Sequence, residues 1–222
     1  DGERLARALW APLFHAAPNI FANRSGRIGF AQQQARIAVD RRYLPTTLHR
    51  RDAHRTLAAH FLSRPLDART LEELPWQYAQ AERWDELAHL LRRHDVLVAL
   101  WLDDPASVLR YWSDIETAVP GRLLDTYRHV LDDQVWESDA IAVVSELFRR
   151  AGHVDRGLAL RTTLTDRALA SGDDGASAIA VGNEANDLNR AGRWSEALER
   201  YEEQELLAES AGISRAIAAA VG

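Results

Sequence analysis

The stretch Ala-Gly-His-Val-Asp-Arg-Gly at residues 151–157 returns 40 residues later as Ala-Gly-Arg-Trp-Ser-Glu-Ala at residues 191–197. The same frame aligns Phe148 with Leu188. Apolar residues at helical spacing flank both copies, so each copy predicts two helices joined by a tight turn. One such pair cannot bury its own apolar face. We therefore expect helix pairs to stack into a solenoid.

Within these copies, a few residues are expected to build the repeat. Gly152 and Gly192 permit a backbone turn that a Cβ atom would strain. Ala197, like its counterpart Gly157, is small enough for the second helix to lie close to the first. Tyr201 is expected to pack in the groove toward the neighbouring pair. A weaker copy, Ala-Glu-Arg-Trp-Asp-Glu-Leu at 81–87, lies off the 40-residue period.

Tryptophan is expected mainly in the core between helix pairs, because buried aromatic side chains dominate such cores. This expectation includes Trp194 as a repeat-building residue. The others that lie on predicted helices are Trp10, Trp76, Trp84, Trp101, Trp112 and Trp136.

The first part of the chain carries the strand signal. Two short apolar stretches, 20–24 and 27–30, surround Ser25-Gly26 and predict a β-hairpin. Helices are predicted before it, over 3–16, and after it, over 31–44. Helix, hairpin and helix in this order form the second half of a winged-helix module.

After Pro45 the pattern predicts helices only. Asp67 or Thr70 is a candidate cap for the helix that follows Pro65. The predicted helices cover 48–63, two segments of 66–93 that join near Glu82, two segments of 94–118 that break at 103–105, and 123–136.

The fold class is therefore mainly α: a partial winged helix with one β-hairpin, then a solenoid of paired helices. The expected domains are a winged-helix module at 1–46, a helical linker with degenerate pairs at 47–136, and repeats at 137–222, the last of them truncated.

The composition of the chain excludes several kinds of site. The chain has 222 residues and no cysteine, which excludes disulfides and thiolate metal sites. No apolar run is long enough to span a bilayer, and we expect a cytoplasmic protein.

Charge is unevenly distributed along the chain. Residues 1–65 contain 11 arginines and four acidic residues, which gives a net charge of +7. Because the whole chain has a net charge of −6, the remainder carries −13. This asymmetry indicates two modules with different surfaces.

The spacing of the last full repeat resembles a tetratricopeptide repeat (TPR). Val181 and Glu209 stand where that repeat usually has tryptophan and proline. The 40-residue period resembles the longer-helix variety found in kinesin light chains and bacterial signalling ATPases. The matching positions are Val181, Ala185, Leu188, Gly192, Trp194, Ala197 and Tyr201.

The winged helix that follows a NACHT-type ATPase domain resembles two segments of this chain, 24–30 and 36–44. Nephrocystin-type members of that class are similar to this chain at 54–61 and 73–77. The resemblance implies a fragment of a multidomain signal-transduction (STAND) ATPase, which senses a ligand through its repeats and binds ATP or ADP elsewhere. The winged helix of the class often carries a histidine that contacts ADP, and here Gln32 occupies that position. Gln32 can donate a hydrogen bond but carries no charge.

No catalytic or metal site is expected. The sequence contains no G-x-x-x-x-G-K-[ST] phosphate loop, so no cofactor is expected in this fragment. His49, His54 and His60 are spaced by five and six residues, which does not match the i, i+4 spacing of a zinc helix. We expect structural roles for them and no enzymatic activity.

The predicted function is a non-catalytic scaffold and sensor that binds a protein or peptide. Its candidate contacts are Asn183, Asn186, Asn189 and Arg190. The asparagine amides can donate to and accept from a peptide backbone. A solvated polar face is an equally good interpretation. Self-association stays open. The alternative function is a transcription regulator whose winged helix binds DNA and whose repeats bind an effector. Basic charge by itself gives only nonspecific nucleic-acid affinity, and this favours a protein partner.

Overall fold

The computed structural model describes residues 12, 15–16, 19–24, 27–130 and 136–212. Within them the chain is mainly helical, with one small antiparallel hairpin, as the sequence predicts. The chain divides into two compact units, Asp1–Leu87 and Ala88–Gly222. The boundary falls inside the segment predicted as a linker, 47–136.

The hairpin of the first unit lies where the sequence predicts it. Strand β1 (Phe21–Arg24) pairs with β2 (Arg27–Phe30), and the rings of Phe21 and Phe30 stack with centroids 5.8 Å apart. Helix α2 (Gln33–Tyr43) follows and contains no buried residue. The helix predicted over 3–16 lies outside the described residues, except at 12 and 15–16.

Two packed helices form the core of the first unit. They are α3 (Thr47–Leu62) and α4 (Ala68–Gln80), and their buried side chains include Phe61 and Leu74. The candidate cap is resolved in favour of Asp67, whose carboxylate accepts a hydrogen bond from the Thr70 backbone N–H at 2.8 Å. Helix α5 (Trp84–Leu91) contains the boundary between the units.

The turn before α5 has the same form as the turns of the later repeat. Glu82 adopts a positive φ of 53°, and the Arg83 N–H donates to the Tyr78 carbonyl at 2.9 Å. The equivalent bonds run from His153 to Phe148 at 2.8 Å and from Arg193 to Leu188 at 3.0 Å. The weaker sequence copy at 81–87 is therefore a structural copy of this turn.

The second unit begins with helices that surround a buried tyrosine. They are α6 (His94–Asp103), α7 (Pro105–Ala118), α8 (Arg122–Thr126) and α9 (Ser138–Arg150). The helix predicted over 123–136 is wrong, because α8 ends at Thr126. At that point Tyr127 is buried against Trp112 and Trp136, and its hydroxyl donates to the Leu91 carbonyl at 2.9 Å. These tertiary contacts override the helical pattern, and the burial raises the pKa of Tyr127.

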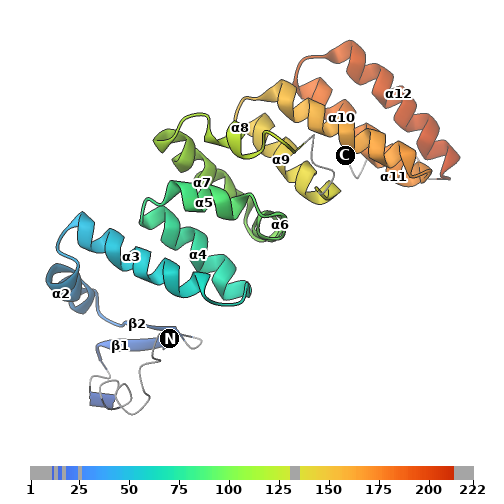
Figure 1. Cartoon of the computed structure of the whole chain (residues 1–222). Helices are drawn as coiled ribbons and strands as arrows, with labels where there is room; N and C mark the ends of the chain where they lie inside the picture. Colours follow the sequence, from blue (N-terminus) through green and yellow to red (C-terminus); the bar gives the residue numbers. More distant parts are fainter. Residues whose placement is uncertain (1–11, 13–14, 17–18, 25–26, 131–135, 213–222) are drawn as a thin grey trace. The chain divides into compact units, whose positions relative to one another are not determined.

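Three helices of equal length follow α9 in the second unit. Helices α10 (Val154–Ala170), α11 (Asp174–Arg190) and α12 (Trp194–Ser210) have 17 residues each and start 20 residues apart. Figure 1 shows them side by side with α9, and each helix contacts the next. Gly152 and Gly192 occupy the predicted bends, with φ of 88° and 78°. Gly172 and Gly212 adopt the same conformation, so the turn recurs every 20 residues.

Small residues allow these helices to approach closely. A Cβ atom on Gly157 would lie 2.9 Å from the Ser145 carbonyl oxygen, and the Ser145 hydroxyl donates to the Gly157 carbonyl at 2.9 Å. Ala197 is buried with Leu158 and Leu188 in a cluster that joins α10, α11 and α12. Tyr201 packs against this cluster, in which Leu158 belongs to the preceding helix pair.

The prediction that tryptophans pack in the core holds for only some of them. Trp112 and Trp136 are buried, and Trp84 and Trp101 are half-buried. For Trp194 the prediction is wrong, because its side chain is 72% exposed. Trp194 is the first residue of α12, and a helical side chain tilts toward the N-terminus, in this case past the end of the helix. Trp76 is also exposed, and Trp10 lies outside the described residues.

Among the described residues, no helix combines the length and the apolar character that a membrane span requires.

Replacing Gly192 should destabilise the repeat through the backbone alone. Its φ of 78° is strained for residues that carry a Cβ atom, and nothing lies within 4 Å of the position that a Cβ would take. We expect Gly192→Ala to lower the free energy of unfolding by about 1 kcal/mol, and Gly192→Asn by less, because asparagine tolerates this conformation. Urea denaturation followed by circular dichroism measures both variants. An alanine variant as stable as the original chain would contradict the assignment.

Candidate partner-binding surfaces

The predicted contact residues lie on α11, and only part of the set shares one face. Asn183 and Asn186 are half-buried, and Arg190 is exposed at the end of the same stripe. Ile179, which the sequence reasoning did not select, lies one turn before Asn183 and is 49% exposed. Asn189 is exposed but lies about 100° around the helix from Arg190. We name Ile179, Asn183, Asn186 and Arg190 the α11 stripe.

Asn186 has a structural contact inside the repeat. Its side-chain oxygen accepts a hydrogen bond from the Tyr201 hydroxyl at 2.8 Å, which links α11 to α12. A substitution of Asn186 would therefore disturb the packing of Tyr201 as well as the exposed surface. Among the described residues, Asn183 makes no such contact, and its amide is available to a partner.

Behind the stripe, a buried carboxylate joins three helices. The Asp187 side chain is 7% exposed and lies 2.9 Å from Arg161 Nε on α10 and 3.3 Å from Arg190 Nη1. Arg149 Nε on α9 lies 4.0 Å away. Arg190, predicted as a partner contact, thus also belongs to this ion cluster, although 57% of its side chain is exposed. The cluster fixes the orientation of α11 behind the stripe.

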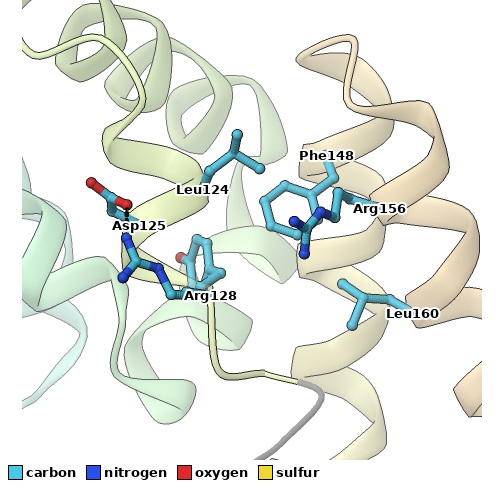
Figure 2. Close-up of a pocket in the computed structure, with 7 residues that line it drawn as sticks. Leu124, Asp125, Arg128, Phe148, Arg156 and Leu160 are labelled. Carbon is cyan, nitrogen blue, oxygen red and sulfur yellow. Dashed lines mark hydrogen bonds and ion pairs between the residues drawn. The ribbon is translucent and has the colours of Figure 1, made fainter.

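A second surface feature is a pocket between α8, α9 and α10, with a volume of about 250 Å³. Figure 2 shows Leu124, Phe148 and Leu160 around it. Asp125 and Arg128 form an ion pair at one side. Arg156 lines the pocket, and among the described residues it forms no ion pair. The pocket therefore combines apolar walls with one cation that no carboxylate of the described residues neutralises.

The remaining candidates are Gln32, considered for ADP contact, and the histidines of α3, considered for metal binding. Gln32 is exposed at the N-cap of α2, and its side chain makes no capping hydrogen bond. His49 Nδ1 lies 2.7 Å from the Thr46 hydroxyl, and His54 Nδ1 lies 2.8 Å from Gln77 Oε1. Among the described residues, no group of three or more metal-ligating side chains comes together.

Sequence reasoning missed the buried acids of α11, although a signal was present. Glu184 continues the apolar positions Val181 and Leu188 at helical spacing, so it faces the core and not solvent. A charged residue in that register requires an internal partner, and Glu184 accepts a hydrogen bond from the Thr162 hydroxyl at 2.7 Å.

Removing the charge of Asp187 should destabilise the second unit strongly. Asp187→Asn leaves Arg161, whose side chain is only 15% exposed, without its counter-charge. We expect a loss of about 2–4 kcal/mol in the free energy of unfolding, measured by urea denaturation. Asp114→Asn, at an exposed position of α7, is the matched control and should change stability by less than about 0.5 kcal/mol. Similar losses in both variants would show that the cluster has no special role.

Comparison of this chain with protein-family models, with curated proteins and with solved structures finds no match. The interpretation of these surfaces therefore rests on their own geometry and chemistry.

Proposed function

We propose that this chain is a non-catalytic scaffold that binds another protein through the α11 stripe. The proposal rests on three features of one helix face: the exposed apolar Ile179, the Asn183 amide, which has no hydrogen-bond partner among the described residues, and the exposed cation Arg190. The opposite face of the same helix is held by buried contacts to α10 and α12.

The stripe fits an extended peptide segment. Ile179 offers an apolar contact, which gains free energy when water is excluded. The Asn183 amide can donate to and accept from a peptide backbone. Arg190 can bind a carboxylate, because its guanidinium keeps donors beyond the one that reaches Asp187. The preferred partner is thus a segment with an apolar side chain and an acidic group.

A rigid helix also reduces the entropic cost of binding. Buried residues of α11 include Ala178, Val181, Ala185 and Leu188, and the Asp187 cluster joins it to α9 and α10. Because these contacts already order the helix, a partner does not have to immobilise it.

The proposal extends to the first unit. Its resemblance to the module next to NACHT-type ATPase domains suggests that it connects the repeats to such a domain, which would bind ATP or ADP. Helix α2 supports this role, because it has no buried residue and exposes Ile37 and Tyr43. A cytoplasmic location and a role in bacterial signalling belong to the same proposal and rest on the same resemblance.

One observation favours the alternative of DNA binding. Helix α2 exposes Arg36, Arg41 and Arg42 beside the hairpin. Such a surface can neutralise phosphates, but none of these contacts selects a sequence.

The α11 stripe is tested by changing its two residues without internal hydrogen bonds. The double variant Ile179→Asp and Asn183→Asp removes the apolar contact and places two negative charges on the face. The original chain and the variant are each immobilised and exposed to a lysate of the source cells. We expect the amount of each captured protein to be at least about tenfold lower on the variant, as measured by quantitative mass spectrometry.

The matched control is Leu198→Asp with Leu206→Asp on α12, which adds the same two negative charges at exposed positions outside the stripe. This variant should capture the same proteins as the original chain. Capture that is unchanged in the stripe variant, or equally reduced in the control, would remove the stripe from consideration.

The alternative is tested with the full chain and a labelled DNA duplex in a mobility-shift assay at low and high salt. We expect no shift at low salt if the first unit contacts protein. A shift that weakens with salt, and that Arg41→Ala with Arg42→Ala abolishes, would favour the DNA regulator instead.

A further inference from the structure

A groove between α10 and α12 lies on a different side of α11 from the stripe. It has a volume of about 480 Å³, and Leu158, Thr162 and Leu188 supply its less charged wall. Glu184 also lines it, and lies about 100° around the helix from Asn183. The charged rim comes from α12 and its N-cap residue, and consists of Arg193, Glu196, Glu199, Arg200 and Glu203.

Glu184 is unusual because its charge is almost completely buried. The residue is 4% exposed. Its Oε1 accepts from the Thr162 hydroxyl at 2.7 Å, whereas its Oε2 is buried without a hydrogen bond. The nearest cation to Oε2 is Arg200 Nε at 3.5 Å. A carboxylate oxygen in this state has an unused capacity to accept hydrogen bonds.

The resident arginines are already committed to other carboxylates. Arg193 Nε donates to Glu196 at 2.7 Å, and Arg200 Nη1 donates to Glu203 at 2.6 Å. The hydrogen bond that Arg193 donates to Glu196 raises the pKa of Arg193, and the charges of Asp155 and Glu184 act in the same direction. Among the described residues, Glu199 has no such partner.

The groove therefore has an excess of negative charge. Its lining contains four carboxylates and two guanidinium groups. The pKa of Arg200 is raised by its hydrogen bond to Glu203, and the charge of Asp166 on α10 contributes in the same direction. A cationic ligand would meet both the buried Oε2 of Glu184 and the free carboxylate of Glu199.

We propose that this groove binds an arginine side chain that a partner protein presents on an extended segment. The aliphatic part of the side chain lies along Leu158 and Leu188. Its planar guanidinium donates to Glu184 Oε2 and to Glu199, the geometry that this group favours with carboxylates. Arg200 remains bound to Glu203 when the incoming guanidinium takes over Oε2.

The test is an NMR titration of the full ¹⁵N-labelled chain with the blocked peptide Ac-Gly-Ala-Arg-Ala-Gly-NH₂. The comparison peptide has citrulline in place of arginine, which keeps the shape and removes the charge. We expect the arginine peptide to shift the amide signals of Thr162, Glu184 and Glu199, and the citrulline peptide to bind at least about tenfold more weakly.

Three variants locate the interaction. Glu184→Gln retains the acceptor for Thr162 and should weaken arginine-peptide binding about tenfold. Glu199→Gln changes an exposed residue, so it tests the groove even if the first variant fails to fold. Glu202→Gln, an exposed position of α12 outside the groove, is the matched control and should bind normally.

Equal binding of the two peptides, or equal losses in Glu199→Gln and Glu202→Gln, would overturn the proposal. The Ile179→Asp and Asn183→Asp variant should bind the arginine peptide normally. The groove and the α11 stripe can therefore fail independently of each other.

Discussion

One backbone residue with positive φ between each two successive helices from α9 to α12 is the constraint on which this part of the second unit depends. Gly152, Gly172 and Gly192 each reverse the chain within three residues, between helices that end at Arg150, Ala170 and Arg190. The next helix must then run antiparallel, close to the helix before it. Every later feature, from the contact at Gly157 to the ion cluster at Asp187, requires this short return.

Helix α11 shows how the repeat combines apolar and charged packing. Val181, Ala185 and Leu188 lie in the core, while Glu184 and Asp187 both reach α10, where they contact Thr162 and Arg161. Asp187 is surrounded by arginines of α9, α10 and α11, whereas Glu184 faces a groove that is rich in acids. Buried charges contribute little net stability compared with apolar residues, but they penalise every arrangement that separates them from their partners. The two acids therefore favour one register of α11 against α10 and α12.

Local rules were sufficient for most of the fold. The 40-residue copies predict the bends at Gly152 and Gly192, and two apolar stretches predict the hairpin. The break predicted at 103–105 lies where α7 begins. Sequence reasoning failed where distant contacts decide the conformation. Tyr127 leaves the helical path because its hydroxyl reaches Leu91, which lies 36 positions earlier. Trp194 fits the apolar pattern of α12, but the pattern does not reveal that a side chain at the first position of the helix is exposed.

The candidate site could be predicted only in part. A search for amide side chains does not select the apolar Ile179, and it does not reveal that Asn186 accepts a hydrogen bond from Tyr201.

The equal length of α10, α11 and α12 bears on how such a chain can evolve. Duplication of any 40-residue segment within this region reproduces a complete pair with its bends in phase, so the array can lengthen without a redesign of its interfaces. A single inserted residue inside α11 has the opposite effect, since it rotates everything that follows by about 100° and turns the apolar side toward water. Growth by whole modules is thus tolerated, whereas frame-preserving insertions of one codon within a helix should be purged by selection.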